Sequence, residues 1–197
     1  MIGVDPQSFT WNFYEWPDAL NDDTVRAINQ TIEREYLFTE PQGYGARHTD
    51  GSEVKNISNI KIISWDKLAD MLSPLVGTAL QIGRMDFGYD LYDIHSSMTL
   101  NYNVYDSKSN DSYNWHIDAT RQATNDMKFT LLINLSDEPY TGGELKVWPK
   151  SDEQCVDNFS KPGSAFMFKS HILHKVEPVI SGVRKTLTMF LYGPRFR

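Results

Sequence analysis

The sequence predicts a mainly β fold, a jelly roll supported by N-terminal helices, on two observations. Apolar residues follow helical spacing only in the first half of the chain, whereas from residue 98 onward short β-rich runs alternate with turn signals. Leading helices followed by many short strands are typical of an antiparallel sandwich backed by helices. The length suits one domain. We therefore expect a single domain over residues 1–197, with a helical support region at 1–97 and a jelly-roll core at 98–197.

The first expected element is a helix over residues 23–35. Asn21, Asp22 and Asp23 offer side chains that cap the N-terminus of a helix. The apolar residues that follow lie three and four positions apart, so they share one helix face: Val25, Ile28 and Ile32.

A second helical stripe in the front half is interrupted by Pro74. Its apolar positions are Leu68, Met71, Leu72, Leu75, Val76, Ala79 and Leu80. Because proline lacks an amide hydrogen and is favoured in the first turn of a helix, we expect one helix to end before Pro74 and another to begin there. Residues 57–63 predict a short strand, and residues 43–51 predict an exposed loop, with a lid as the alternative.

The back half predicts a series of short strands separated by turns. Gly142-Gly143 and Pro162-Gly163 are suited to tight turns. The expected strands cover residues 98–105, 113–118, 129–135, 144–148, 165–168, 173–178 and 186–192. Such spacing indicates antiparallel pairing in a sandwich or barrel.

Charge and cysteine content exclude several classes of function. A formal net charge of −7 and an isoelectric point near 5.2 argue against a nucleic-acid or anionic-membrane binder, because such binding relies on Lys and Arg neutralising phosphates. Cys155 is the only cysteine, which suits a reducing compartment. The N-terminus lacks a secretory pattern, and no stretch reaches the roughly 18 apolar residues of a membrane span. We expect a cytoplasmic protein and leave its oligomeric state open.

The central motif is His116-Ile117-Asp118. Alternate residues of a strand point to the same face, so the imidazole and the carboxylate lie side by side. Two such ligands and a histidine from elsewhere make the facial triad that holds non-haem Fe(II) and leaves coordination positions open. Two histidines compete for the third place, His171 and His174.

Arg184 follows His174 by ten residues, a spacing that fits one strand, a turn and the adjacent strand. Its planar guanidinium grips a carboxylate with two parallel hydrogen bonds, which a lysine does not match. We expect it to anchor the far carboxylate of a dicarboxylate cosubstrate that chelates the metal. By strand alternation, Thr186, Thr188 and Phe190 share the face of Arg184 and lie near that cosubstrate.

The run from Asn114 to Gly193 resembles the prolyl 4-hydroxylase-like branch of the iron(II)- and 2-oxoglutarate-dependent oxygenases. The matching pieces, in order, are Trp115-His116-Ile117-Asp118, Leu135-Ser136-Asp137-Glu138, Gly142-Gly143-Glu144-Leu145, Pro162-Gly163, Leu173-His174-Lys175-Val176-Glu177-Pro178-Val179 and Gly182-Val183-Arg184. The front half resembles the family only loosely, as the helices that support the double-stranded β-helix.

The resemblance implies roles for individual residues. His116, Asp118 and His174 are then the catalytic iron ligands, with His174 favoured over His171 by its position relative to the arginine, and Arg184 binds 2-oxoglutarate. Tyr105 stands near the place where this branch has a tyrosine that contacts the cosubstrate, and Tyr102 is its competitor.

The resemblance also implies an activity, in which oxidative decarboxylation of 2-oxoglutarate to succinate is coupled to hydroxylation of an unactivated C–H bond. A prolyl residue of a peptide or protein is the expected substrate from the branch alone, with a free amino acid or other small molecule as the alternative. Ascorbate is the candidate reductant. Asp118 favours hydroxylation, because related halogenating enzymes lack this carboxylate.

Three other classes compete with the oxygenase. A jelly-roll metal-binding module and a zinc hydrolase both leave Arg184 without a purpose, and no glutamate stands as an obvious general base for hydrolysis. An oxygenase acting on nucleic-acid bases is disfavoured by the acidic balance.

Overall fold

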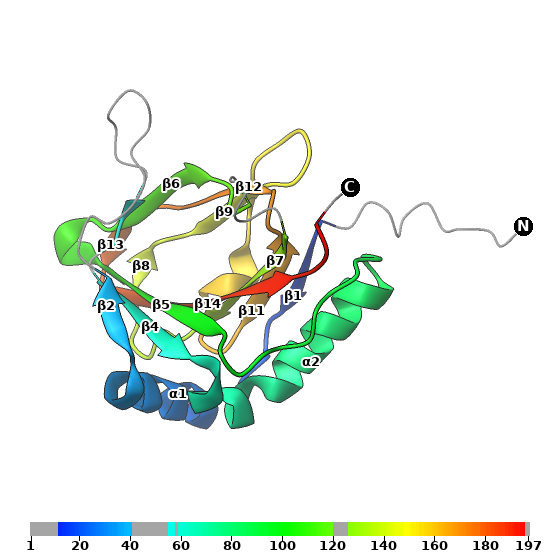
Figure 1. Cartoon of the computed structure of the whole chain (residues 1–197). Coiled ribbons are helices and arrows are strands. Elements are labelled where there is room, and N and C mark those ends of the chain that lie inside the picture. The colour runs from blue at the N-terminus through cyan, green and yellow to red at the C-terminus, as the bar shows by residue number, and fades with distance from the viewer. Residues whose placement is uncertain (1–11, 41–54, 58, 120–125, 196–197) are drawn as a thin grey trace, which may run out of the picture.

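The computed structural model describes residues 12–40, 55–57, 59–119 and 126–195, and the loop or lid predicted at 43–51 lies outside them. Two β-sheets face each other, and two helices lie on the outer side of the larger sheet (Figure 1). All strand pairs between described residues are antiparallel. The predicted fold class, a jelly roll supported by helices, is confirmed.

The larger sheet has seven strands, and its neighbours come from distant parts of the chain. Across the sheet these are β1 (Phe13–Trp16), β11 (Ala165–Lys169), β7 (Met127–Asn134), β14 (Val183–Tyr192), β5 (Thr99–Asp106), β4 (Asn59–Ser64) and β2 (Phe38–Glu40).

The smaller sheet has five strands and faces the larger one. Across it these are β10 (Gln154–Cys155), β9 (Leu145–Trp148), β12 (Leu173–Val176), β6 (Ser112–His116) and β3 (Lys55–Asn56). A separate pair joins β13 (Val179–Ser181) to β8 (Thr141–Gly142), and short 3₁₀ turns lie at Trp65–Lys67, Ser107–Ser109 and Asp157–Ser160.

Helix α1 spans Asp22–Glu35, so the predicted helix over 23–35 is confirmed. Its N-cap is Asn21, whose side-chain oxygen accepts a hydrogen bond from the Thr24 amide at 2.9 Å. The predicted apolar face is buried against the larger sheet, with Ile28 and Ile32 fully inaccessible. Truncation of either isoleucine to alanine would cost about 2–5 kcal/mol.

Helix α2 runs without interruption over Ala69–Met85 and contains Pro74, so the prediction of two helices divided at that residue is wrong. Proline removes the hydrogen bond that its amide would give to the carbonyl of Asp70, four residues earlier. Both residues are exposed, so the carbonyl is accessible to water. The buried stripe of Leu72, Leu75 and Val76 holds the helix on the sheet across the proline.

Alternation along the central strands separates two apolar cores. Leu187 and Met189 of β14 point to the helices, while Phe166 and Phe168 of β11 point between the sheets. Polar residues of β14 take the inner face, where the core between the sheets is left open for a site: Arg184, Thr186 and Thr188.

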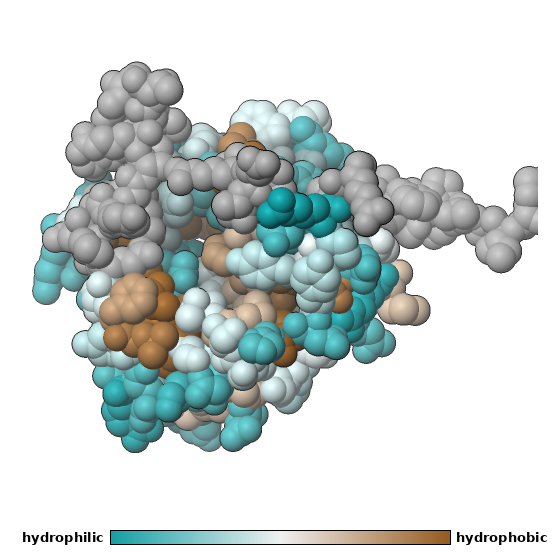
Figure 2. Space-filling view, in the orientation of Figure 1, coloured by the Kyte–Doolittle hydropathy of each residue, from teal (hydrophilic) through white to brown (hydrophobic). Residues whose placement is uncertain are grey.

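The first 97 residues supply strands as well as helices, which differs from the expected helical support region. β1, β2 and β4 extend the larger sheet and β3 extends the smaller one. Of the expected strand at 57–63, β4 covers residues 59–63. An apolar patch lies over β2 in Figure 2, where Leu37 and Phe38 are each 55% exposed. Among the described residues, no helix is long and apolar enough to cross a membrane.

Candidate metal and carboxylate site

Two neighbouring strands of the smaller sheet bring the predicted metal ligands together. His116 is the last residue of β6 and His174 lies in β12, and the two are register partners in the antiparallel pair. Asp118 follows just beyond β6, where its amide donates to the carbonyl of Ser170 at 3.0 Å. The structure therefore places all three side chains in one cluster.

The ligand atoms of the cluster converge. The Nε2 atoms of His116 and His174 each lie 3.7 Å from an oxygen of Asp118, and the three ligand atoms lie within 4.8 Å of one another. The Nδ1 atom of His116 contacts the Asn114 carbonyl at 2.7 Å, and that of His174 contacts the Ile172 carbonyl at 2.9 Å. Because a carbonyl only accepts, each Nδ1 carries the proton and each Nε2 presents a lone pair.

Burial sets the protonation of the cluster. It lowers the pKa of His174 to about 4, so this imidazole is neutral near pH 7 and does not have to lose a proton to bind a metal. Burial also raises the pKa of Asp118, against the opposing effects of His116 and of a hydrogen bond from Thr130. A cation at the cluster would favour the ionised carboxylate.

His171, the rival third ligand, is exposed and is not part of the convergent group. Trp115 and Trp148 are sequence neighbours of residues that point between the sheets. The two indoles contact each other with ring centroids 5.9 Å apart. Each neighbours an inward residue of its strand, His116 or Val147, so alternation places both indoles on the outer face of the smaller sheet. Neither lines the metal-site cavity.

Arg184 lies on β14 of the opposite sheet and is only 1% exposed. Its three guanidinium nitrogens have no hydrogen-bond partner among the residues that the structure describes. The guanidinium carbon lies 5.0 Å from the ring centroid of Tyr105 and 5.6 Å from that of Phe159. A buried guanidinium without a hydrogen-bond partner in the described part of the chain is an incomplete arrangement that an anion would complete.

Gly143 makes room for the arginine. A Cβ atom at this position would lie 2.8 Å from Cδ of Arg184, and the φ angle of +74° at Gly142 and +69° at Gly143 belongs to the left-handed region. The Gly-Gly turn predicted from the sequence therefore also shapes the cavity around the guanidinium, a contact that no sequence pattern indicated.

Strand alternation decides between the two tyrosines. Tyr105 is the register partner of Arg184 and points between the sheets. Tyr102 points to the helices, where its hydroxyl donates to Oδ1 of Asn29 at 3.0 Å. Burial raises the pKa of Tyr105 to about 12, so its phenol stays protonated and can donate a hydrogen bond.

One cavity joins these groups. It is lined by His116, Asp118, His174, Arg184, Tyr105, Thr186 and Thr188, together with apolar side chains. The Thr188 hydroxyl accepts a hydrogen bond from the Asn103 amide at 3.0 Å. These predicted residues therefore lie around the same space, whereas Phe190, which was also expected near the cosubstrate, is not among the residues that line it.

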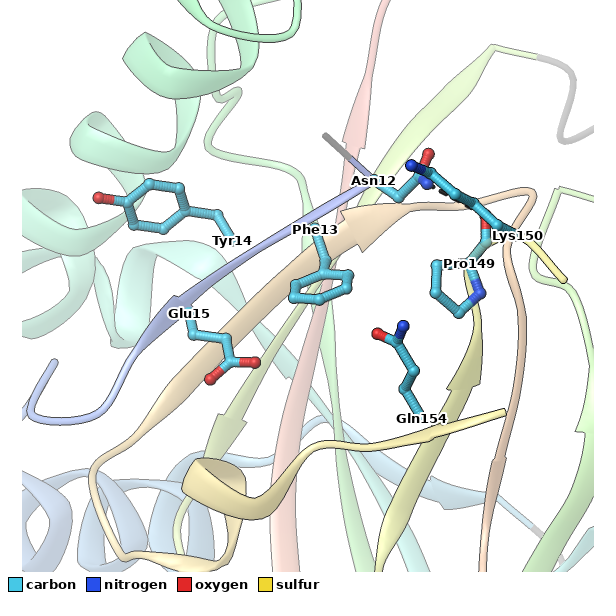
Figure 3. A pocket seen from close by; sticks show the side chains of 7 residues that line it. All are labelled: Asn12, Phe13, Tyr14, Glu15, Pro149, Lys150 and Gln154. Atoms are coloured by element: carbon cyan, nitrogen blue, oxygen red, sulfur yellow. Dashed lines mark hydrogen bonds between the residues drawn. The ribbon is translucent and has the colours of Figure 1, made fainter. Parts of the chain in front are cut away.

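A larger groove of about 500 Å³ lies between β1 and the β9–β10 hairpin (Figure 3). Phe13 and Gln154 point toward it, whereas Tyr14 points to the other side of β1. Its lining shares no residue with the metal-site cavity. The groove is thus a separate feature of the surface.

The residues present fit an iron ion and a dicarboxylate. Two imidazoles and one carboxylate form the donor set of non-haem Fe(II) sites that keep open positions. The unpaired guanidinium of Arg184, buried in the same cavity, is complementary to a carboxylate.

Comparisons with known proteins agree with this geometry. Residues 100–192 match the 2OG-Fe(II) oxygenase superfamily. A PKHD-type hydroxylase of Synechococcus sp. (strain CC9605) is 29% identical over 121 residues, which are 60% of this chain and 51% of the relative. The chain thus spans about half the length of the curated relative that it matches.

Solved structures share the fold. A prolyl-4-hydroxylase of Pseudomonas putida superimposes with a TM-score of 0.70 at 20% identity, covering 94% of each chain. A prolyl hydroxylase of Trichoplax adhaerens, in complex with a hypoxia inducible factor peptide fragment, gives 0.66 at 17% identity over 92% of this chain and 84% of that one.

The matched segment contains His116, Asp118, His174 and Arg184, so the whole predicted site lies in the part of the chain that is similar to the 2OG-Fe(II) oxygenase superfamily.

Proposed function

We propose that this protein is a 2-oxoglutarate- and Fe(II)-dependent dioxygenase that hydroxylates an unactivated C–H bond of a prolyl residue in a peptide or protein. The observation that carries the proposal is the buried, unpaired Arg184 in the same cavity as the His-Asp-His cluster. A metal-binding module or a zinc hydrolase needs the cluster but has no use for this arginine.

Each residue then has a distinct role in the reaction. His116, Asp118 and His174 hold the iron, and Arg184 binds the far carboxylate of 2-oxoglutarate by its two-pronged guanidinium. When bound, the iron and the cosubstrate supply the oxidising power by reducing dioxygen as 2-oxoglutarate becomes succinate and carbon dioxide. Tyr105 donates its phenolic hydrogen toward the same carboxylate, and Thr186 and Thr188 offer hydroxyl groups along the cavity.

The rest of the cavity wall restricts water. Leu132, Leu145 and Val176 line it beside the metal ligands, and all three side chains are buried. A dry wall strengthens the attraction between Arg184 and a carboxylate and protects a reactive centre from side reactions.

The names of the similar proteins support a prolyl residue of a peptide or protein as the substrate. They include a PKHD-type hydroxylase, a prolyl-4-hydroxylase and a prolyl hydroxylase in complex with a peptide fragment. Ascorbate would serve as the reductant that returns oxidised iron to Fe(II).

The first test is succinate formation from 2-oxoglutarate by purified protein with Fe(II) under air, comparing the wild type with His174→Ala and Arg184→Ala. Turnover that is lost in both variants supports the class, and Tyr102→Phe serves as a control outside the cavity. A folded, iron-loaded wild type that neither binds nor consumes 2-oxoglutarate would leave the metal-binding module as the better reading.

The second test addresses the substrate. Proline-containing peptides are incubated with enzyme that turns over 2-oxoglutarate, with and without ascorbate, and are analysed by mass spectrometry. Gain of one oxygen atom on proline supports the proposal. If no peptide is oxidised under active turnover, the substrate is a free amino acid or another small molecule.

A further inference from the structure

Thr130 and Ser170 contact Asp118 from the larger sheet, and neither was singled out from the sequence. Thr130 lies on β7 and donates its hydroxyl hydrogen to Oδ2 of Asp118 at 2.5 Å. Ser170 follows β11 directly, and its backbone carbonyl accepts from the amides of Asp118 and Ala119 at 3.0 and 3.1 Å. Both hydroxyl residues are buried, with 1% and 0% of their surface exposed.

The direction of the hydrogen bonds follows from counting hydrogens. Thr130 has one hydroxyl hydrogen, and the ionised carboxylate of Asp118 accepts it because a carboxylate only accepts. The Oγ atoms of Thr130 and Ser170 lie 3.2 Å apart, so the serine must be the donor in that contact. The chain of donation therefore runs from Ser170 to Thr130 to Asp118.

The two histidines of the cluster are also held by hydrogen bonds to groups outside it. His116 and His174 each have a backbone carbonyl that fixes the ring and leaves Nε2 for the metal. Asp118 has no carbonyl in that role, and the hydroxyl of Thr130 fixes its carboxyl group instead.

We propose that Thr130 is a positioning residue for the metal centre, which fixes the orientation of the Asp118 carboxylate toward the ion by donating to Oδ2, with Ser170 orienting the Thr130 hydroxyl. The inference rests on the proposed function only in placing a metal ion at the His-Asp-His cluster.

The test uses Co(II), which reports its coordination by visible absorption and needs no turnover. The full chain, metal-free, is titrated as wild type, Thr130→Val, Thr130→Ser and Ser170→Ala. Thr141→Val is the control, because that exposed hydroxyl lies on β8 and contacts only Ser181 among the described residues. Loss of an outer hydrogen-bond partner typically weakens metal binding by about 10–100-fold.

We expect Thr130→Val to bind Co(II) about tenfold more weakly and with an altered spectrum, Thr130→Ser to restore both, and Ser170→Ala to have a smaller effect in the same direction. A purely structural role would lower the melting temperature of the metal-free Thr130→Val protein while affinity and spectrum stay as in the wild type, and this result would overturn the proposal. If the wild type binds no Co(II), the metal site itself fails, which is a different outcome from wild-type binding that is insensitive to Thr130.

Discussion

Arg184 and Tyr105 stand opposite each other across the β14–β5 pair, with the guanidinium carbon 5.0 Å from the centre of the tyrosine ring. The ring offsets part of the cost of burying the charge but accepts no strong hydrogen bond from it. The folded protein therefore holds a buried cation that an anionic ligand can bind, and burying this charge lowers the stability of the ligand-free protein.

The first prediction is that Arg184→Met makes the ligand-free protein more stable while abolishing its response to 2-oxoglutarate. Methionine fills a similar volume without a charge, and replacing buried charges by apolar groups often stabilises by about 1–4 kcal/mol. Thermal unfolding with and without the cosubstrate measures both effects. Arg184→Lys, which keeps the charge but loses the fork, should retain a weakened response. A ligand-free Arg184→Met protein less stable than the wild type would show that the charge is already satisfied.

The second prediction concerns Gly143. Gly143→Ala places a methyl group 2.8 Å from Cδ of Arg184 in the wild-type geometry, so the arginine must move and the affinity for 2-oxoglutarate should fall about tenfold. The left-handed backbone at this position adds a cost of about 1–2 kcal/mol to folding.

Gly77→Ala is the matched control for that substitution. Apart from its chain neighbours and the nearby backbone of α2, no described residue has an atom within 4 Å of a Cβ atom at this position, so alanine should stabilise the helix by about 1 kcal/mol with no change in cosubstrate affinity. Calorimetric titration separates the two variants. Equal 2-oxoglutarate affinity in both would mean that Gly143 does not shape the arginine.

The third prediction separates the two tyrosines. Tyr105→Phe should weaken 2-oxoglutarate binding by about tenfold, the worth of one hydrogen bond to a charged group. Because the pKa of Tyr105 is raised to about 12, its hydroxyl stays protonated from neutral to mildly alkaline pH, and the ratio of the two affinities should not change over that range.

Tyr102→Phe should act on stability instead. It leaves Oδ1 of the buried Asn29 without its donor, which costs about 1–3 kcal/mol of unfolding free energy, and 2-oxoglutarate affinity should be unchanged. Denaturant unfolding and ligand titration of both variants check this. An effect of Tyr102→Phe on binding as large as that of Tyr105→Phe would reverse the assignment.

The fourth prediction tests the third ligand. Addition of Fe(II) without oxygen should raise the unfolding temperature of the wild type and of His171→Ala, and leave His174→Ala unaffected, because binding to the native state alone stabilises it. His174 is neutral near pH 7 since burial lowers its pKa to about 4, so this stabilisation should persist through mildly acidic pH as far as His174 determines it. Loss of the effect in His171→Ala would point to the exposed histidine.

The sequence predicted the back half of the fold well because its strands are short, separated by turns and rich in alternating residues. It predicted α1 from a cap and an apolar face that both occur in the structure. The prediction that a helix ends before Pro74 was wrong, because the packing of α2 on the sheet outweighs the local preference of proline for a helix start. β1 and β2 were not expected, since each is held by pairing with a distant strand.

The site shows the same division between local and distant contacts. His116 and Asp118 were predicted from strand alternation together with a partner histidine and the family resemblance, and Arg184 from its chemistry and its distance from His174. Thr130 could not be found in this way, because nothing in its surrounding sequence indicates that its hydroxyl meets Asp118. The choice between Tyr102 and Tyr105 needed the pairing register, as a shift of one residue exchanges the two faces of a strand.

The two predicted histidine ligands lie on β6 and β12 of one sheet and Arg184 lies on β14 of the other, so a dicarboxylate bound at both ends would bridge the two sheets. The distance between the sheets would then select the number of carbon atoms between the two carboxylates. A shorter diacid reaches one anchor and not the other, and a longer one has to bend. Discrimination among cosubstrates would then depend on how the two sheets are packed, to which buried apolar side chains such as Leu132 and Leu145 contribute.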